Sequence, residues 1–219
     1  MFLQNSCQFH NLANINRKCT FSKGKSFMNE LYLVRHGQTK WSITGQHTSS
    51  TDLPLTTQGC KQAGLLKKRL SRIHFELVLT SPLKRSLETC ELAGFSKTAN
   101  IDADLREWDY GLYEGWTKRQ ILTKAPGWNI FINGAPNGES TEDVKNRANT
   151  ILDKIQSTQG NVLIFSHGHF LRLFLTQWLQ VPSSQANLFM LTTASISLLS
   201  FDDSVRVINT WNDIGHLYA

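Results

Sequence analysis

The sequence predicts an α/β protein in which three layers, α/β/α, enclose a mostly parallel central sheet. Short apolar runs at residues 31–34, 77–79 and 162–165 are typical of buried strands. Helix-like stretches separate these runs, and strands that alternate with helices favour a parallel sheet. The chain has 219 residues, of which 40% are hydrophobic and 18% charged, enough for one α/β domain with a substantial core.

The first predicted strand, at residues 31–34, is followed by a long polar loop at residues 38–55. We expect Thr56 or Thr57 to cap a helix that runs to about Ile73. Its buried face is predicted from helical spacing to contain the following residues: Cys60, Ala63, Leu66, Leu70 and Ile73.

The middle of the chain supplies the second strand, at residues 77–79, and then a helix over about residues 84–93. Ile101 marks a short edge strand. Residues 104–117 show no clear period and are rich in aromatic side chains. We therefore expect an irregular segment there.

The last part of the chain begins with a helix from Ser140 to about Gln156, because an acid three residues after Ser140 is typical of a capping box. The third buried strand follows at residues 162–165, and another helix spans about residues 170–179. Two final strands are expected to form a hairpin: residues 195–201 and 205–210.

The ordered domain is predicted to begin at Met28. Residues 1–27 show no periodicity, and we expect either a disordered extension or a segment upstream of a working start at Met28. Residues 28–219 then form a single domain. Four basic residues and no acid lie within residues 1–29, so the rest of a chain of net charge +6 is only slightly basic. This balance argues against a nucleic-acid partner.

The four cysteines form no C-x-x-C pair, which is typical of a reducing compartment. No apolar run reaches the length of a membrane span. We therefore expect a cytoplasmic protein without a membrane partner, and the sequence leaves its oligomeric state open.

The three buried strands end in polar, reactive residues. Arg35 and His36 follow the first strand, Ser81 follows the second, and His167 follows the third. Ligands of open α/β sheets bind outside the carboxyl ends of the strands. Arg85 lies one helical turn beyond the second strand. The sequence thus predicts two histidines and two arginines at one edge of the sheet.

This set of side chains suits a phosphoryl group. A transferring phosphoryl group needs fixed positive charge, and the planar guanidinium group pairs two oxygens and stays protonated. A neutral imidazole can attack phosphorus and form a covalent intermediate. Gly37 and Gly168 follow the two histidines, and we expect them to let the backbone approach the ligand.

Four motifs resemble, in the same order, those of the histidine phosphatase superfamily, in its phosphoglycerate mutase-like branch. The motifs are Arg35-His36-Gly37-Gln38-Thr39, Thr80-Ser81-Pro82-Leu83-Lys84-Arg85, Leu105-Arg106-Glu107-Trp108-Asp109-Tyr110-Gly111 with Glu114-Gly115, and Ser166-His167-Gly168. They cover residues 30 to about 210 and imply a phosphoglycerate mutase-like fold. The sequence of residues 42–56 resembles that of a subgroup of acid and sugar phosphatases.

The resemblance implies a role for each matching position. His36 would be the nucleophile, and Glu107 would be the general acid and base. Three side chains would hold the phosphate: Arg35, Arg85 and His167. Further substrate-binding candidates are Thr39, Ser42, Gly168 and Trp108. Ser42 stands where many members have an asparagine, so its role is left open.

The general acid has to protonate the leaving oxygen and later deprotonate a water molecule. Glu107 has aromatic neighbours, and partial desolvation there would favour the protonated carboxyl. The nearby rivals are Asp104, Asp109 and Glu114, and the spacing of the family motif alone selects Glu107.

We therefore expect a phosphatase that hydrolyses small phosphate monoesters, with sugar phosphates as the first guess. No cofactor and no metal is expected, since arginines at the site would repel a cation. One alternative is a phosphoglycerate mutase, although mutases of this family shield the site with longer insertions than residues 108–166 provide. The other is a non-catalytic module that binds phosphorylated ligands.

Overall fold

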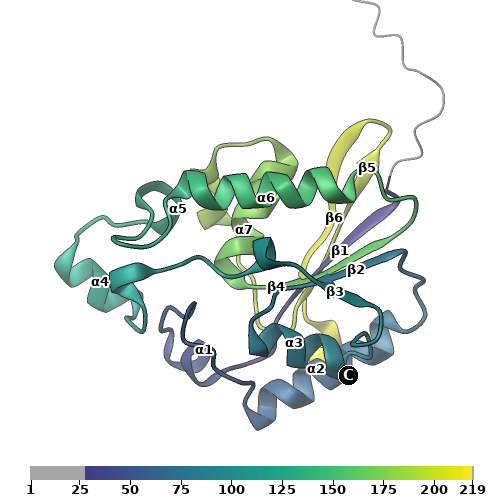
Figure 1. The fold of residues 1–219 in the computed structure, drawn as a ribbon, viewed down its shortest axis with the longest axis horizontal. Helices are drawn as coiled ribbons and strands as arrows, with labels where there is room; N and C mark the ends of the chain where they lie inside the picture. The colour runs from purple at the N-terminus through teal and green to yellow at the C-terminus, as the bar shows by residue number, and fades with distance from the viewer. Residues whose placement is uncertain (1–27, 219) are drawn as a thin grey trace, which may run out of the picture.

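A six-stranded sheet runs through the centre of the protein, in a computed structural model that describes residues 28–218 (Figure 1). The strands are β1 (Glu30–Arg35), β2 (Leu77–Thr80), β3 (Ala99–Ile101), β4 (Val162–Ser166), β5 (Ile196–Asp202) and β6 (Val205–Asp213). Their order in the sheet is β3-β2-β4-β1-β5-β6. The first four of these are parallel, whereas β5 pairs antiparallel with β1 and β6 pairs antiparallel with β5.

Helices cover both faces of this sheet. The α-helices are α1 (Lys40–Thr44), α2 (Thr57–Leu70), α3 (Lys84–Leu92), α4 (Lys118–Lys124), α5 (Ile130–Asn133), α6 (Thr141–Ile155) and α7 (Gly168–Leu179). Short 3-10 turns are η1 (Ala103–Leu105), η2 (Gly111–Tyr113), η3 (Ser183–Leu188) and η4 (Gly215–Leu217). Figure 1 shows α2 and α3 on one face, α6 and α7 on the other, and α1, α4 and α5 beyond one end of the sheet. The predicted three-layer fold is confirmed.

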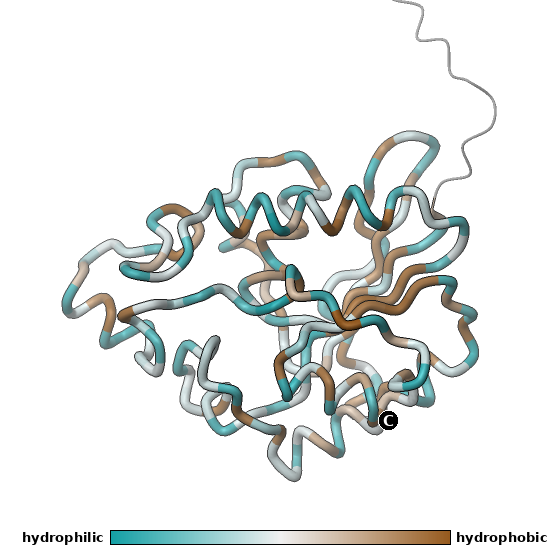
Figure 2. Tube along the Cα trace, viewed as in Figure 1, coloured by the Kyte–Doolittle hydropathy of each residue, from teal (hydrophilic) through white to brown (hydrophobic). Residues whose placement is uncertain are grey.

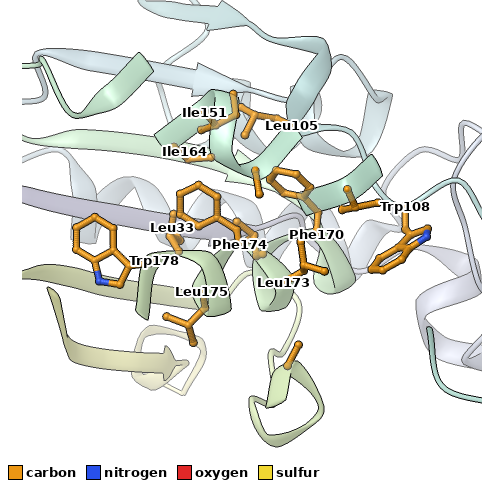
Figure 3. Close-up of a cluster of buried hydrophobic side chains, with 14 of the residues drawn as sticks. Leu33, Leu105, Trp108, Ile151, Ile164, Phe170, Leu173, Phe174, Leu175 and Trp178 are labelled. Carbon is orange, nitrogen blue, oxygen red and sulfur yellow. The ribbon is translucent and has the colours of Figure 1, made fainter. Parts of the chain in front are cut away.

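The strands β1, β2 and β4 are buried on both faces over most of their length, as their continuous apolar runs predict. Leu33 packs into the hydrophobic cluster on the α6 and α7 side, and the next residue, Val34, packs into the cluster on the α2 and α3 side. Figure 3 shows Leu33 and Ile164 of the sheet against Phe170 and Phe174 of α7. The apolar colouring of the central strands in Figure 2 follows from this double burial.

One buried residue of α2 is placed wrongly by the sequence pattern. Cys60 is exposed, and Gly59 occupies the buried face with Ala63, Leu66 and Leu70. A Cβ atom on Gly59 would lie 2.1 Å from the carbonyl oxygen of Gln38. This close backbone approach turns the helix so that the glycine faces inward.

Polar caps decide where α6 and α1 begin. The Ser140 hydroxyl accepts the Asp143 N–H in the predicted capping box of α6. A second capping box, between Thr39 and Ser42, starts α1 inside the segment predicted as a loop. Hydropathy does not reveal α1, because its five residues bury no face. Helix α7 begins at Gly168, two residues earlier than the apolar pattern indicates.

No helix among residues 28–218 is both long and apolar enough to cross a membrane. The expected extension at residues 1–27 lies outside the described residues. Met28, the first described residue, is buried in the main core.

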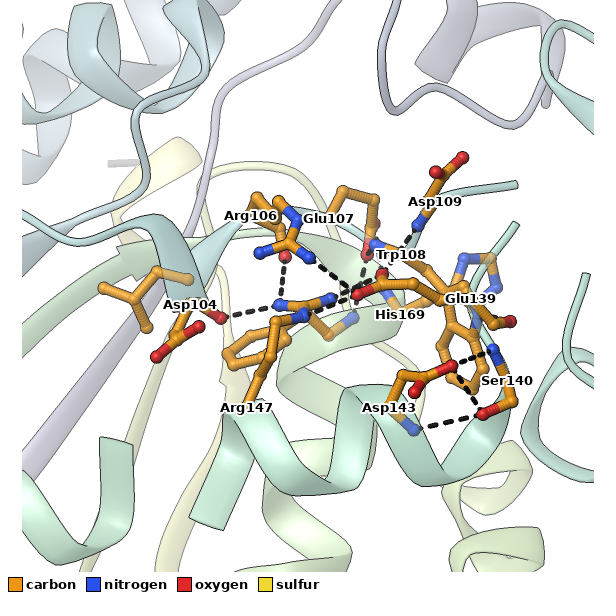
Figure 4. Close-up of polar contacts among 12 residues, drawn as sticks. Asp104, Arg106, Glu107, Trp108, Asp109, Glu139, Ser140, Asp143, Arg147 and His169 are labelled. Atoms are coloured by element: carbon orange, nitrogen blue, oxygen red, sulfur yellow. Dashed lines mark hydrogen bonds and ion pairs between the residues drawn. The ribbon is translucent and has the colours of Figure 1, made fainter. Parts of the chain in front are cut away.

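A buried ion pair holds the irregular segment that follows β3 (Figure 4). The Glu139 carboxylate accepts hydrogen bonds from Nε and Nη2 of Arg147, from Arg106 and from the backbone N–H of Asp109. Nη1 of Arg147 donates to the carbonyl oxygens of Asp104 and Arg106. Arg147 of α6 and Glu139 together clamp the backbone on both sides of Glu107, although this backbone forms no regular structure.

We expect Glu139→Ala to lower the free energy of unfolding by about 3–5 kcal/mol, because it leaves the buried Arg147 charge without a partner. The control is Glu142→Ala. The Glu142 side chain is 67% exposed and pairs with Lys145 at the surface, so this variant should lower the free energy of unfolding by about 1 kcal/mol or less. Urea unfolding measures both. Similar losses for the two variants would contradict a clamping role for Glu139.

Candidate active site

The insertion of β4 between β1 and β2 brings the ends of three strands together. Arg35 is paired with Ser166, and the His36 N–H donates to the Ser166 carbonyl. The Ser81 N–H donates to the carbonyl of Phe165 on the other side of β4. The polar residues that end the three strands therefore lie side by side, as the strand-end rule predicts.

His36 is set up as a neutral nucleophile. Its Nδ1 lies 2.7 Å from the carbonyl oxygen of Gly37. A carbonyl only accepts hydrogen bonds, so Nδ1 carries the proton and Nε2 carries the lone pair. Burial holds the pKa of His36 well below its ordinary value, and the charges of Arg85 and Arg35 act in the same direction.

Nitrogens of Arg35, Arg85 and His167 lie near His36 without protein partners. The His36 and His167 ring centroids are 5.2 Å apart. Among the described residues, no hydrogen bond reaches Nε of Arg35, Nε and Nη1 of Arg85, or Nδ1 of His167, although all are buried. Buried donors without partners are costly, and a phosphate offers oxygens to several of them at once.

The second histidine is oriented by Ser81, a residue to which the sequence analysis assigned no role. Nε2 of His167 lies 2.7 Å from the Ser81 hydroxyl oxygen, which also accepts the Leu83 N–H. Because the hydroxyl has no other acceptor among the described residues, it donates to Nε2. Nδ1 of His167 then keeps its proton and can donate to an anion. Burial first, and Arg85 next, hold the pKa of His167 well below its usual range.

Of the four acids considered, only Glu107 lines the pocket. Glu114 instead accepts the backbone N–H groups of Ser49 and Thr51, and Asp109 accepts that of Gly111. Their carboxylates hold loops in place. The tertiary structure therefore singles out the same residue that the motif spacing selects.

The Glu107 carboxylate lies at the N-terminus of α7. Its Oε1 accepts the N–H groups of Trp108 and Phe170, and its Oε2 accepts that of His169. The sequence predicted an acid beside aromatic rings, and the structure adds three backbone N–H donors that fix the carboxylate in place. Oε2 has one donor and keeps a free lone pair for a proton.

The pocket around His36 has a volume of about 180 Å³. Four predicted substrate-binding residues line it: Arg35, Thr39, Ser42 and Gly168. The prediction that Trp108 lines the pocket is wrong. Its indole is fully buried against Phe131 and donates to the Glu139 carbonyl, so it belongs to the core.

The Ser42 hydroxyl is already engaged in a helix cap. It donates to the Thr39 carbonyl and accepts the Thr39 N–H, at 2.8 and 2.9 Å. Its expected part in phosphate binding stays a prediction.

The two motif glycines make room for protein atoms, whereas the sequence analysis expected them to face a ligand. A Cβ atom on Gly37 would lie 2.6 Å from the Gly59 carbonyl oxygen. A Cβ on Gly168 would lie 3.3 Å from the Arg35 guanidinium. These glycines therefore let α2 and Arg35 approach the site closely.

Four residues of the pocket lining have ionisable side chains that the sequence did not assign to the site: His47, Tyr110, His169 and Arg172. The rings of His47 and His169 are stacked, with centroids 5.5 Å apart and planes 3° apart. The Tyr110 hydroxyl lies 2.6 Å from Nδ1 of His169. A second histidine two residues after His167 was the available sequence signal for this part of the pocket. Within residues 28–218, no three His, Cys, Asp or Glu side chains group as metal ligands would.

The matches to known proteins cover the part of the chain that forms this site. The family model for the histidine phosphatase superfamily (branch 1) matches residues 31–214. An acid phosphatase from Mycobacterium tuberculosis is 38% identical over 85% of this chain and 93% of its own. A sedoheptulose 1,7-bisphosphatase from Saccharomyces cerevisiae is 34% identical over 67% of this chain and 66% of its own. A probable phosphoglycerate mutase from Citrobacter koseri is 31% identical over 88% and 96%.

A solved structure of an open reading frame from Mycobacterium tuberculosis superposes with a TM-score of 0.78 and 39% identity. The match covers 84% of this chain and 97% of that chain. The site geometry, the family model and these relatives agree: this chain belongs to branch 1 of the histidine phosphatase superfamily.

Proposed function

We propose that this protein hydrolyses small phosphate monoesters through a phosphohistidine formed on His36. The observation that carries the proposal is the group of unpartnered nitrogens from Arg35, Arg85 and His167 around a neutral imidazole. A relative named acid phosphatase supports hydrolysis of phosphate esters.

In the first step, the Nε2 lone pair of His36 attacks phosphorus and the bond from phosphorus to the ester oxygen breaks. The charge on the phosphoryl oxygens is held by Arg35, Arg85 and the Nδ1–H of His167. Glu107 donates a proton to the leaving oxygen. The products of this step are an alcohol and phosphohistidine.

In the second step, a water molecule takes the place of the alcohol and loses a proton to Glu107. Its oxygen attacks phosphorus, and the P–N bond breaks with its electron pair returning to Nε2 of His36. Inorganic phosphate leaves, and Glu107 is again protonated.

The proposed reaction requires no metal ion or cofactor, because arginine side chains supply the positive charge. The partner is a small phosphorylated substrate, with sugar phosphates as the first choice. We place the protein in the cytoplasm, where Cys60 and Cys90 would remain free thiols, as they are in the structure.

Phosphoglycerate mutase activity is the second candidate, because a relative is named a probable phosphoglycerate mutase. A mutase has to exclude water while its phosphohistidine waits for the acceptor. The described C-terminal residues do not serve as a cover, since η4 packs on α2 and Asp213 pairs with Arg69 near the end of that helix. This arrangement favours hydrolysis.

We expect radiolabelled substrate to leave phosphate on His36. After an acid quench, the label should be lost on warming in acid, because the P–N bond is acid-labile. His36→Ala should take up no label, and the control His74→Ala, which removes an exposed ring, should label normally. Labelling of His36→Ala would overturn the proposed nucleophile.

We expect Glu107→Gln to lower turnover by roughly 100- to 10,000-fold, the usual contribution of a general acid. The loss should be smaller for nitrophenyl phosphate, whose leaving group needs no proton. The control Asp104→Asn should retain activity, because the Asp104 carboxylate is not part of the pocket. An equal loss of Glu107→Gln on all leaving groups would rule out proton donation.

We expect hydrolysis to exceed phosphoglycerate isomerisation. The assay supplies 3-phosphoglycerate with catalytic 2,3-bisphosphoglycerate in EDTA and follows 2-phosphoglycerate and free phosphate together. Phosphate release should dominate, since water reaches the phosphohistidine. If isomerisation is faster on every substrate tried, the mutase candidate replaces the phosphatase, and loss of all activity in EDTA would refute metal independence.

A further inference from the structure

A second cavity, of about 500 Å³, adjoins the pocket that contains His36. His47, His169 and Arg172 line both spaces. The pocket at His36, of about 180 Å³, suits a phosphoryl group and its first substituents. A larger leaving group therefore has room beyond the stacked histidines.

Arg172 is fixed at the junction of the two cavities. Its Nε donates to the Ala186 carbonyl at 3.0 Å, and its guanidinium lies over the Phe131 ring, 4.8 Å from the centroid. Neither terminal nitrogen has a hydrogen-bond partner among residues 28–218. A guanidinium held in this way presents a fork of donors to a carboxylate or a phosphate.

The charges around the second cavity have one sign. Its lining contains Arg172 and Lys118 and, among the described residues, no Asp or Glu. His47 and His169 add no charge at neutral pH, because burial lowers the pKa of each. An anion in this cavity would meet two cations.

The apolar residues that line the second cavity suit the carbon skeleton of a substrate with two anionic groups. Trp128, Phe131, Ile130, Leu122 and Met190 line the cavity. Sugar rings and chains commonly pack on such surfaces while their charged ends are held by cations. A purely apolar leaving group would leave Arg172 unpaired.

We propose that this cavity is a leaving-group subsite in which Arg172, with Lys118, binds a second anionic group of the substrate. The proposal rests on the phosphatase function proposed above and narrows its substrate class to phosphate monoesters that carry a further phosphate or carboxylate.

Matched substrates test this subsite through phosphate release. Fructose 1,6-bisphosphate is compared with fructose 1-phosphate and fructose 6-phosphate, and 3-phosphoglycerate with glycerol 3-phosphate. The fructose phosphates test for binding of an additional phosphate, and the glycerol-based pair tests for binding of a carboxylate. We expect kcat/KM to be at least about tenfold higher for the doubly anionic member of one set, since a charge-assisted hydrogen bond contributes about 1.5–3 kcal/mol.

The variants are Arg172→Gln, Arg172→Lys and the control Arg119→Gln, which removes an exposed arginine of α4 next to Lys118. We expect Arg172→Gln to lower kcat/KM about 10- to 100-fold more for the doubly anionic ester than for its monoanionic partner. Arg172→Lys should recover part of that difference, and Arg119→Gln should behave as the unaltered protein. Circular dichroism and thermal melting check that each variant is folded.

If Arg172→Gln lowers kcat/KM equally for both members of each set, the subsite proposal is wrong. It is also wrong if the unaltered protein shows no preference for the doubly anionic member of either set. If nitrophenyl phosphate is hydrolysed while this preference is absent, the subsite alone fails. If the protein releases phosphate from no ester, the proposed function fails with it.

Discussion

Two guanidinium groups lie at the carboxyl edge of the sheet, that of Arg85 buried and that of Arg35 partly buried, and each has buried nitrogens that no described residue satisfies. Burial lowers the pKa of both groups, because water solvates a cation poorly at this edge of the sheet. Leaving a buried charge without a partner costs several kcal/mol. An anion that pairs with these groups recovers that free energy, so the site favours a phosphoryl group.

The surrounding fold prevents the site from relaxing by collapse or by rotation of its side chains. Arg35 donates to the Leu191 carbonyl and lies against Gly168, where any larger residue would displace it. Arg85 donates to the Thr48 carbonyl at 2.9 Å. Ser81 holds the ring of His167. Each arginine thus has one backbone anchor and keeps buried nitrogens without a partner among the described residues.

Irregular segments complete the site, and ionic side chains hold them where helices and strands do not. The pair Glu139–Arg147 fixes the backbone beside Glu107, while Glu114 binds N–H groups of residues 49 and 51. Glu88 binds the N–H of Leu55 in the same way. These carboxylates substitute for backbone pairing in the loops, so that segments without regular structure carry fixed functional groups.

The sequence by itself determined the strands, the caps of α2 and α6 and the residues that end each strand. Apolar runs, capping boxes and strand-end motifs are local features, and local chemistry specifies them. Only the tertiary structure decided that β4 lies between β1 and β2, because strand order depends on segments far apart in the chain. It also paired His47 with His169, opened the cavity beside Arg172 and placed Trp108 in the core. Residues 104–117, which include Trp108, have no period that could indicate a core position, since long-range packing and ion pairs determine their backbone.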